Sequence, residues 1–545
     1  MKSDNQLQFL ALGGSGEIGM NVNLYGAQGK WVMVDCGMTF SNGDYPGIDL
    51  VLPDLSFIED RLDDLTGIVL THGHEDHIGA LRFFAEDLGV PLYATPFTAG
   101  LIAEKLKEDD SLGSVELNVV EVGGSIELGP FAITFVPLAH SIPEANALLI
   151  KTDAGTVFHS GDWKTDAEAL LGEPTTIEEL RAIGDGGVTA LVCDSTNVFN
   201  EVESGTEQSV RAGLEEQVRK AKGRVVVTTF ASNAMRLHTL GEVAKATGRT
   251  VTVAGRSLDR ILRVAKATGY LRKFPEPISW DAAIDLTPSK LLIIATGGQG
   301  EPRAALGRMA EGSHPIKLDK GDTVLFSARQ IPGNENAVAA IQNKLAAQGV
   351  VMVTDRQANI HVSGHPGRPE LKAMYEALRP DILIPVHGER RHLEEQARFA
   401  KECGIPHTLV QISGQAVQLA PGAPKIVGQE RVGRLVLDGD VILPADGTTI
   451  NERRRIAERG TIAVALAVDK SGRLASQPSI TMQGVPLEED RNEFLAEAGE
   501  DVERTVAKGR LSSKELSEKV RLAVRRTATR WTGKKPIVDV MVLEV

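Results

Sequence analysis

The chain has 545 residues and a formal net charge of −14 at pH 7, with 42% hydrophobic and 24% charged residues. Its length exceeds what one hydrophobic core usually supports, so we expect about two to four domains. The acidic balance excludes a generally basic nucleic-acid coat, although a local basic channel stays compatible with it. The sequence has neither a signal peptide nor an apolar run of roughly 18 to 20 residues, which predicts a cytoplasmic protein without a membrane partner.

The first motif along the chain is "ALGGSGEIGMN", in which Gly14, Gly16 and Gly19 form a G-x-G-x-x-G pattern. With Asp35 further on, this is the nominal fingerprint of a dinucleotide-binding turn, in which the last glycine opens an amphipathic helix. In residues 22–34, however, apolar side chains alternate with a period of two on both sides of a glycine-containing turn. This alternation predicts a β-hairpin, which disfavours dinucleotide binding and makes the glycine segment a tight turn between strands.

The segment "IVLTHGHEDHIGAL" contains the densest group of metal-ligand residue types. An apolar strand ends at Thr71, a helix is expected to begin around Ile78 to Phe84, and an H-x-H-x-D-H motif lies between them. The motif supplies His72, His74, Asp76 and His77. Imidazole and carboxylate together suit zinc, manganese or iron, and alternate positions can face two different ions. We therefore predict a metal site here rather than a solvated polar turn.

Three further ligand-type residues stand at the ends of apolar strands. They are His140 in "FVPLAHSIPEA", Asp162 in "GTVFHSGDWKTD" and His387 in "PDILIPVHGERRH". Sites are commonly built on loops at strand ends, and the carboxylate of Asp162 is placed to bridge two metals. In contrast, His159 lies on a strand, where we expect it to pack. The histidines outside any motif, which we do not expect to be ligands, are His238, His314, His392 and His407.

More than 200 residues separate the second and third of these strand ends, enough for an inserted domain. Within that interval a strand ends at Asp194, and "ANIHVSGHPGRPEL" offers His361, Ser363 and His365. Helical and strand patterns alternate over residues 206–355, which indicates parallel βαβ units in an open sheet. Two of the strands, in "KLLIIATGG" and "DTVLFSARQIPG", end in glycine-containing loops, where such sheets place ligand sites.

A segment rich in Gly and Pro, "LAPGAPKIVGQERVG" followed by "PADGTT", leads to a small C-terminal α+β module. Strands "GTIAVALAV" and "PIVDVMVLEV" bracket two helices there. We expect the module to mediate oligomerisation, with an RNA contact as the alternative. Residues 504–535 carry many Lys and Arg but only Glu515 and Glu518 as acids, which favours a solvated helix face over an RNA-binding patch.

The N-terminal motifs together resemble the metallo-β-lactamase superfamily. Asp35 matches its first motif, and the cluster from His72 to His77, then His140 and Asp162, follow in order. In that superfamily the glycine-rich segment resembles the turn between the first two strands, close to the metal centre. The resemblance thus gives the glycine segment a place beside the metals.

Within the superfamily, the chain resembles the β-CASP subfamily of nucleases, since Asp194, His365 and His387 match its motifs A, B and C. The segments "AHSIPEA", "SGDWKTD", "CDSTN", "ATGGQGEP", "IPGNEN" and "HVSGHPG" occur in the order and form of the ribonuclease J family. The resemblance covers residues from about 9 to 440 strongly and the C-terminal region loosely. No ligand position departs from the family pattern.

The resemblance implies an αββα metallo-β-lactamase fold with an inserted β-CASP α/β domain and a small α+β C-terminal domain. We expect the first part of the metallo-β-lactamase domain at 1–205, the insert at 206–355, the second part at 356–445, a linker at 446–458 and the C-terminal domain at 459–545. The implied cofactors are two Zn²⁺ ions per subunit, with Mn²⁺ or Mg²⁺ as alternatives in turnover.

The resemblance also implies roles for single residues. One metal is expected at His72, His74 and His140 and the other at Asp76, His77 and His387, with Asp162 bridging them and Asp35 supporting the site. The expected catalytic residues are Asp76, Asp194 and His365. Substrate contacts are expected from His361, Ser363, Gly364 and His365. A 5′-phosphate pocket is expected at Gly298, Gln299, Gly300, Glu301 and Arg329, although a glycine-containing turn there would equally serve packing.

The implied activity is that of a zinc-dependent ribonuclease acting in mRNA decay and in rRNA and other RNA processing. It would be a 5′-to-3′ exoribonuclease that prefers 5′-monophosphorylated RNA, with endoribonuclease activity in addition. The expected partners are single-stranded RNA, further copies of the chain in a homodimer or homotetramer formed through the C-terminal domain, and an RNA-degradation complex. The alternatives are a DNA-directed β-CASP nuclease and a catalytically silent RNA-binding scaffold.

Overall fold

The computed structural model describes residues 5–41, 43–108, 111–301, 303–331, 333–509 and 511–545. The chain divides into two compact units, one formed by residues 1–42 and 50–434 and the other by residues 43–49 and 435–545. The larger unit contains two mixed β-sheets and a separate parallel sheet, and the smaller unit contains one helix-covered sheet.

The core of the larger unit is a sandwich of two sheets. The first sheet has the order β24-β23-β1-β3-β4-β7-β8-β9. Its strands are β1 (Leu7–Gly13), β3 (Val22–Ala27), β4 (Lys30–Val34), β7 (Leu65–Val69), β8 (Leu92–Ala94), β9 (Leu117–Val119), β23 (Gln415–Ala420) and β24 (Lys425–Gln429). The second sheet has the order β10-β11-β12-β13-β14-β20-β22. Its strands are β10 (Ser125–Leu128), β11 (Phe131–Leu138), β12 (Ala145–Thr152), β13 (Gly155–His159), β14 (Ala190–Asp194), β20 (Ile382–Val386) and β22 (His407–Thr408).

The core of the sandwich is formed by apolar side chains from both sheets. Phe9 and Val34 of the first sheet share one buried cluster with Phe135, Ile150 and Ile384 of the second. The expected hairpin is confirmed, because β3 and β4 pair antiparallel. Burial on both faces explains why these strands are almost continuously apolar.

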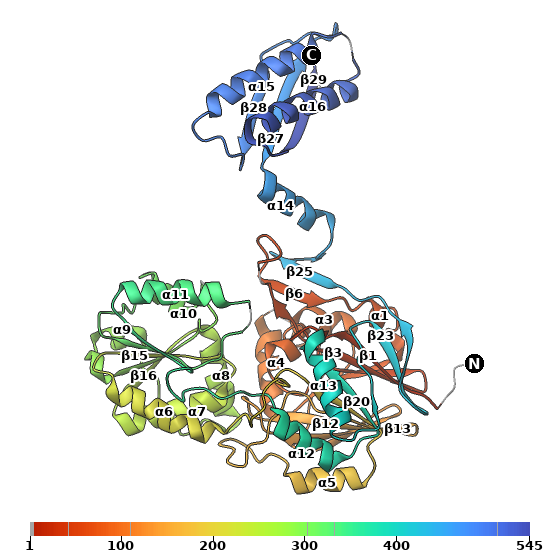
Figure 1. Ribbon diagram of the computed structural model, residues 1–545, viewed down its shortest axis with the longest axis vertical. Coiled ribbons are helices and arrows are strands. Elements are labelled where there is room, and N and C mark those ends of the chain that lie inside the picture. Colours follow the sequence, from red (N-terminus) through yellow and green to blue (C-terminus); the bar gives the residue numbers. More distant parts are fainter. Residues whose placement is uncertain (1–4, 42, 109–110, 302, 332, 510) are drawn as a thin grey trace. The chain divides into compact units, whose positions relative to one another are not determined.

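Helices cover the outer faces of the sandwich (Figure 1), which confirms the αββα arrangement. They are α1 (Ser56–Glu59), α2 (Glu75–Ile78), α3 (Leu81–Leu88), α4 (Pro96–Glu108), α5 (Ile177–Asp185), α12 (Arg368–Leu378) and α13 (Arg390–Glu402), with a 3₁₀ turn at Leu62–Asp64. Leu180 of α5, with Leu371 and Tyr375 of α12, packs on Phe158 and Leu383 of the second sheet. The short strand pairs are β2 (Ser15–Gly16) with β21 (Gly388–Glu389) and β5 (Thr39–Phe40) with β6 (Leu50–Pro53).

The insert is a parallel five-stranded sheet of order β16-β17-β15-β18-β19 with helices on both faces (Figure 1). Its strands are β15 (Val225–Thr228), β16 (Thr250–Ala254), β17 (Leu291–Ala295), β18 (Thr323–Phe326) and β19 (Val351–Thr354). Its helices are α6 (Glu207–Lys220), α7 (Ala234–Thr247), α8 (Arg256–Ala267), α9 (Trp280–Asp285), α10 (Ala305–Ala310) and α11 (Glu335–Ala347), with a 3₁₀ turn at Pro288–Lys290. The βαβ alternation predicted from the sequence is confirmed.

The smaller unit is an α+β domain. Helices α15 (Arg491–Val506) and α16 (Ser513–Thr532) share one apolar core with the sheet β28-β27-β29. The strands of the unit are β25 (Arg434–Asp438), β26 (Val441–Pro444), β27 (Thr461–Val468), β28 (Ser479–Gln483) and β29 (Ile537–Glu544). Strand β28 was not predicted from the sequence. The segment expected as a linker, 446–458, forms most of helix α14 (Thr448–Arg459).

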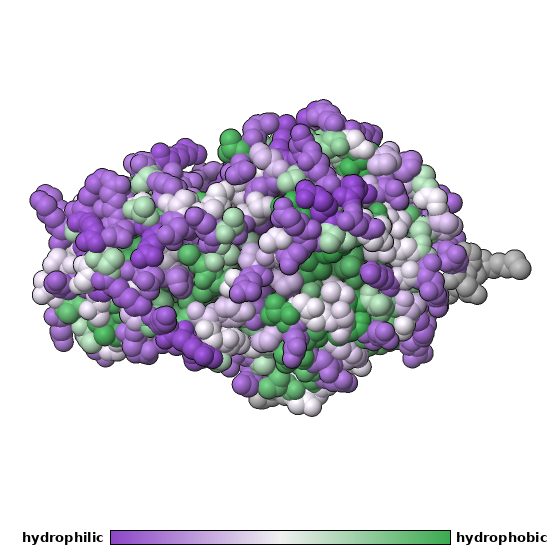
Figure 2. Space-filling view, turned by 90° about the horizontal axis from the view of Figure 1, so that it is seen from below, coloured by the Kyte–Doolittle hydropathy of each residue, from purple (hydrophilic) through white to green (hydrophobic). Residues whose placement is uncertain are grey.

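The surface is largely polar. Seen from below, hydrophilic residues cover most of the visible face, and hydrophobic residues form smaller groups between them (Figure 2). Among the described residues, no helix combines the length and the apolar character needed to cross a membrane.

Candidate metal centre

Four strand ends bring together the seven residues predicted as ligands. The loop and helix after β7 carry His72, His74, Asp76 and His77; His140 follows β11, Asp162 follows β13 and His387 follows β20. Their potential ligand atoms form two overlapping groups, each with all atoms within 4.8 Å of one another. The helix after the motif begins earlier than expected, at Glu75, so that Asp76 and His77 lie in its first turn.

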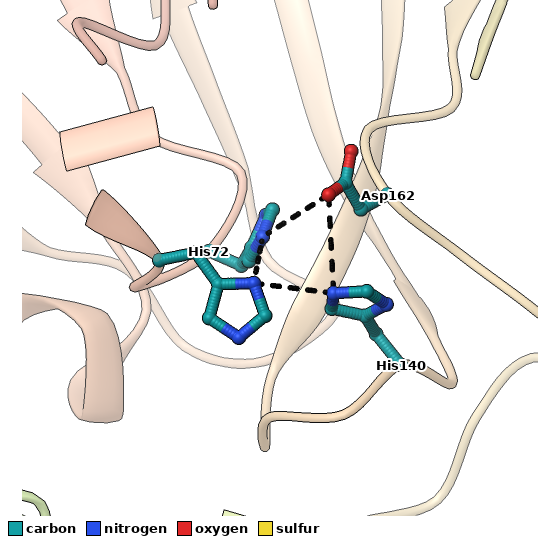
Figure 3. A group of neighbouring side chains, drawn as sticks. His72, His140 and Asp162 are labelled. Carbon is teal, nitrogen blue, oxygen red and sulfur yellow. Dashed lines mark hydrogen bonds and ion pairs between the residues drawn. The ribbon is translucent and has the colours of Figure 1, made fainter. Parts of the chain in front are cut away.

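The first group, here called the histidine half, consists of His72, His74 and His140 with the shared Asp162. Nδ1 of His74 lies 3.1 Å from Nε2 of His72 and 3.2 Å from Nε2 of His140. Oδ2 of Asp162 lies 3.8 Å from Nε2 of both His72 and His140. Figure 3 shows the imidazoles of His72 and His140 and the carboxylate of Asp162 pointing toward one another. The nitrogens thus converge on one small volume.

The second group, here called the carboxylate half, consists of Asp76, His77 and His387 with the shared Asp162. Nε2 of His77 lies 3.3 Å from Oδ2 of Asp162 and 3.7 Å from Oδ2 of Asp76. Nε2 of His387 lies 3.1 Å from Oδ2 of Asp76. Asp162 is therefore the only residue common to both groups, which is the geometry a bridging carboxylate requires.

Hydrogen bonds at Nδ1 fix the ring orientation of four histidines. Nδ1 of His77 donates to Oδ2 of Asp35 over 2.7 Å, and Nδ1 of His140 donates to the Gly364 carbonyl over 2.6 Å. Nδ1 of His72 and of His387 contact the hydroxyls of Thr71 and Thr196 at 3.0 and 2.7 Å. With Nδ1 held in this way, each ring turns its Nε2 toward the cluster, which is the orientation of a metal-binding imidazole.

The charge balance of the cluster fits divalent cations. Asp162 is 2% exposed, and its Oδ2 has no hydrogen-bond partner among the described residues. Asp35 and Asp194 are also buried beside the cluster. Because a buried carboxylate is costly unless it is paired or coordinates a metal, this set of oxygens and imidazole nitrogens is suited to metal binding.

The two halves differ in their protonation. Burial lowers the pKa of His72 and His140 well below its ordinary value, and that of His74 to about 4. For His387, burial alone would lower the pKa, but the charge of Asp162 and hydrogen bonds to Asp194 and Asp76 raise it to about 10. The histidine half therefore consists of neutral nitrogens, whereas the carboxylate half stabilises positive charge.

The glycine segment that resembles a dinucleotide turn lies against the metal-binding motif. A Cβ atom on Gly19, whose φ is +87°, would lie 3.5 Å from Cβ of Asp76. A Cβ on Gly37 would lie 1.8 Å from the Asp76 carbonyl oxygen, so only glycine fits there. Asn21, the last residue of the segment, donates to the same carbonyl, and its Nδ2 lies 3.0 Å from Nε2 of His77. The segment thus packs around the helix turn that carries the carboxylate half.

His365 and Asp194 form a hydrogen-bonded pair beside the cluster. Nδ1 of His365 lies 2.7 Å from Oδ2 of Asp194, and the His365 ring stacks on His387 with a centroid distance of 5.5 Å. Burial opposes protonation of His365, but the charge of Asp194 and its hydrogen bond raise the pKa. The pair therefore holds a protonatable group at the edge of the metal cluster.

The residues expected to contact phosphate lie in two places. Ser363 forms a tight turn with His365, and the half-buried His361 has a buried Nδ1 without a hydrogen-bond partner among the described residues. Arg329 reaches Asn197, whose amide donates to the His365 carbonyl. These residues thus surround the His365 turn.

The expected phosphate pocket of the insert lies after β17. Its central residue, Gln299, hydrogen-bonds the Arg329 carbonyl and the Ile331 amide, each at 2.9 Å. The Glu301 carboxylate accepts from the Gln299 amide, and a Cβ on Gly300 would lie 2.6 Å from the Ala337 backbone. Gly298 likewise packs on Thr228. These contacts join the loop after β17 to the loop after β18. They favour a packing role for Gln299 over a role in binding phosphate.

The remaining histidines lie outside the cluster. His159 is buried on β13, where its Nδ1 is 2.9 Å from the Tyr25 hydroxyl. His238, His314, His392 and His407 belong to none of the potential metal groups found among the described residues. The supporting residues Asn21, Thr71 and Thr196 were not predicted from the sequence, because their only signal is a position within or beside a motif.

The two-sheet sandwich, the strand-end cluster and the α/β insert define a hydrolase of the metallo-β-lactamase class. Family models match in four places: a beta-lactamase superfamily domain at 30–183, a ribonuclease J beta-CASP domain at 222–345, a Zn-dependent metallo-hydrolase RNA specificity domain at 350–410 and a ribonuclease J C-terminal domain at 448–545. The chain belongs to the ribonuclease J family, a family of metal-dependent ribonucleases.

Relatives match along the whole chain. A ribonuclease J of Sinorhizobium meliloti is 40% identical, covering 100% of this chain and 98% of that protein. A ribonuclease J of Mycobacterium tuberculosis is 38% identical, covering 99% and 97%. The crystal structure of a protein of unknown function from Enterococcus faecalis, 16% identical, superposes with a TM-score of 0.54 over 76% of this chain and 100% of that one. This last likeness concerns the fold.

Proposed function

We propose that the chain hydrolyses RNA phosphodiester bonds, as a 5′-to-3′ exoribonuclease that prefers a 5′-monophosphate and as an endoribonuclease. The observation that carries this proposal is the His365–Asp194 pair, 2.7 Å apart, at the edge of a seven-residue cluster suited to two metal ions. Family membership supports RNA as the substrate. Roles in mRNA decay and rRNA processing follow from the same resemblance.

The proposed metal ligands are the residues of the histidine half and the carboxylate half, with Asp162 shared between them. Two zinc ions held there would lower the pKa of a water and neutralise charge on the phosphoryl oxygens. Asp162 and Asp76 orient the site, and Asp35 holds Nδ1 of His77 over 2.7 Å, which turns Nε2 of that ring toward the cluster. Zinc suits the histidine-rich donors, and Mn²⁺ or Mg²⁺ stay alternatives.

His365 is proposed to bind the scissile phosphate or to protonate the leaving 3′-oxygen. The charge of Asp194 and its hydrogen bond raise the pKa of His365 above the ordinary value, which favours the protonated ring, and Asp194 orients it through Nδ1. Nε2 is then the donor toward substrate. His361, Ser363 and Arg329 would contact neighbouring phosphates. The products would carry a 5′-phosphate and a 3′-hydroxyl.

The proposal is tested with one single-stranded RNA, prepared with a 5′-monophosphate or a 5′-triphosphate, beside a DNA of the same sequence. We expect release of mononucleotides from the monophosphorylated RNA, abolished by a chelator and restored by zinc or manganese. Degradation of the DNA alone would place the chain among DNA-directed nucleases. Binding of RNA without hydrolysis in any metal would make it a silent scaffold.

We further propose that the C-terminal domain joins subunits into a homodimer or homotetramer in the cytoplasm. Met541 and Leu543, on β29, are 62% and 51% exposed, and such apolar side chains on a sheet commonly mark an interface. The cations of α16 support its solvated-face interpretation, because Arg521 pairs with Glu518 and Arg530 with Glu497. Sedimentation of the Met541→Lys variant tests the interface: a mass unchanged from wild type would contradict it. Association with an RNA-degradation complex is a separate expectation.

A further inference from the structure

The chain passes between the metallo-β-lactamase domain and the insert twice, and the two passages lie side by side. The outgoing passage, residues 195–206, runs from β14 to α6, and the returning passage, residues 355–367, runs from β19 to α12. Nδ2 of Asn197, in the outgoing passage, donates to the carbonyl oxygen of His365, in the returning passage, over 3.2 Å, so the passages are in direct contact. The returning passage carries His365.

A buried arginine joins the passages at the end nearer the insert. Arg236 of α7 is fully buried, and its Nε and Nη2 donate to the two carboxylate oxygens of Glu207 over 2.5 and 3.0 Å. Glu207 opens α6, directly after the outgoing passage. Nη1 of Arg236 donates to the Ser327 carbonyl over 2.8 Å and to the Ile360 carbonyl, in the returning passage, over 3.0 Å.

A buried glutamate joins the same passages at the end nearer the metal cluster. Glu370, 3% exposed, accepts from the amide and hydroxyl of Ser204 over 2.9 and 2.7 Å and from the Gly367 amide over 2.7 Å. It also accepts from the amide and hydroxyl of Thr165, each over 3.0 Å. All five donors are neutral. One carboxylate therefore holds both passages and the loop that follows Asp162.

We propose that Arg236 and Glu370 are positioning residues that clamp the two passages at two levels and thereby set His365 over the metal cluster. The span between the clamps in the returning passage includes Gly364, whose carbonyl oxygen accepts from Nδ1 of His140 over 2.6 Å. Movement of this span would shift His140, a predicted metal ligand, together with His365. The inference rests on the proposed role of His365.

The two clamps act on different parts of the reaction. Glu370 holds Thr165 and Gly367, which lie three and two residues from Asp162 and His365, so its loss disturbs groups at the reacting phosphate. A displacement of about 1 Å there costs roughly 10²-fold in turnover. Arg236 holds Ile360 and Ser327, next to His361 and near Arg329, so its loss disturbs contacts to neighbouring phosphates. It is expected to act mainly on KM.

The variants keep the interior free of unpaired charge. Glu370→Gln keeps the size of the side chain but turns an amide nitrogen toward groups that donate. Arg236→Met is combined with Glu207→Leu, because removing one partner of a buried ion pair is far more destabilising than removing both. Arg236→Lys is prepared in parallel as a milder variant that tests the same clamp. The controls are Glu376→Gln, exposed on α12, and Arg219→Met, exposed on α6.

Two measurements on the full metal-loaded chain decide the proposal. Hydrogen exchange should become about tenfold or more faster at Ser204 and Gly367 in Glu370→Gln, and in peptides covering 357–363 in the arginine variants, while β15 and β20 keep their protection. Steady-state hydrolysis of 5′-monophosphorylated RNA should show roughly 10²-fold lower kcat with unchanged KM for Glu370→Gln. The arginine variants should show about tenfold higher KM with nearly unchanged kcat.

Passages that exchange as in wild type would overturn the proposal, and so would a kcat that falls only in proportion to the unfolded fraction. Both control variants should match wild type. A wild-type chain that does not cleave RNA would instead contradict the proposed function, and the exchange measurement would still decide whether the clamps exist.

Discussion

The two halves of the metal cluster hold their side chains by different means. In the histidine half, burial keeps His72, His74 and His140 neutral, and the surrounding anchors are a hydroxyl and a backbone carbonyl. In the carboxylate half, His77 and His387 lie among carboxylates that raise the pKa of both against the effect of burial. The two halves therefore share Asp162, but the protein favours neutral imidazoles in one half and positive charge in the other.

This contrast implies unequal affinity for a cation. A cation in the carboxylate half gains charge compensation from Asp76 in addition to Asp162, with Asp35 behind His77. A cation in the histidine half is held by three neutral nitrogens and the shared carboxylate. Because charge interactions are stronger in a buried site, we expect a chelator to empty the histidine half first.

The largest effect is expected from Asp162→Asn, which breaks both halves at once. Loss of the shared charge should lower RNA hydrolysis roughly 10³-fold, about 4 kcal/mol in activation free energy. The measurement is the single-turnover rate together with bound zinc per chain. Asp153→Asn, at an exposed turn, is the matched control. A variant that retains two zinc ions would show that Asp162 does not bridge them.

Next comes Gly364→Ala, which separates the halves. The new Cβ would lie 2.7 Å from Cε1 and 2.9 Å from Nδ1 of His140, so the imidazole has to move. We expect about 10²-fold slower turnover and loss of metal from the histidine half alone. Gly113→Ala, where a Cβ meets nothing within 4 Å, is the control. Equal loss of both metals would remove the distinction between the halves.

A smaller change should follow Asp35→Asn, which weakens the anchor of His77. Partners of this kind typically contribute 10- to 100-fold in metal affinity, so we expect a loss of that size in the carboxylate half. Competition with a fluorescent chelator measures the two affinities. Asp35 also accepts from Thr71, whose hydroxyl contacts His72 and so links Asp35 to the histidine half. An equal loss of metal affinity in the histidine half would contradict the distinction between the two halves.

The smallest effect at neutral pH is expected from His159→Gln, a buried imidazole outside the cluster. Burial lowers the pKa of His159 to about 4, below its ordinary value of 6.5. The unfolded chain therefore binds more protons between those values, so the free energy of unfolding falls as pH decreases from 6.5 toward 4. Removing the imidazole should therefore make the free energy of unfolding less dependent on pH. Between pH 7 and pH 5 the variant should lose about 2 kcal/mol less of it than wild type. Urea unfolding at pH 7 and pH 5 measures this, with exposed His407→Gln as control; parallel pH profiles would contradict it.

The sequence was sufficient to predict the cluster because its members combine ligand chemistry with a place at a strand end. His140 and His387 are single residues, but each follows an apolar strand, and strands β11 and β20 run in the same direction, so their carboxyl ends lie at one edge of the sheet. The groups that hold the predicted ligands in place through hydrogen bonds could not be predicted in the same way. The Gly364 carbonyl has no residue signature, and the hydroxyl of Thr196 belongs to a common residue type.

Buried charges and weakly patterned elements also escaped prediction. Arg236 and Glu370 are of types that are rarely buried, so only their tertiary contacts reveal them. Helix α14 buries a single residue, Ile450, which gives too little amphipathic pattern to separate it from a linker. Strand β28 is short and mostly exposed, so its alternation is faint.

The order of the strands also sets when the protein becomes complete during synthesis. Leu7 of β1 pairs with Ala420 of β23, and Ala190 of β14 pairs with Ile382 of β20, across the whole insert. A ribosome that has just made Asp162 must add more than 200 residues before His387 exists. At about 5 to 20 residues per second this takes roughly 10 to 45 s, during which the nascent chain cannot close its metal centre. We therefore expect the nascent chain to gain activity only after the insert and His387 have been made.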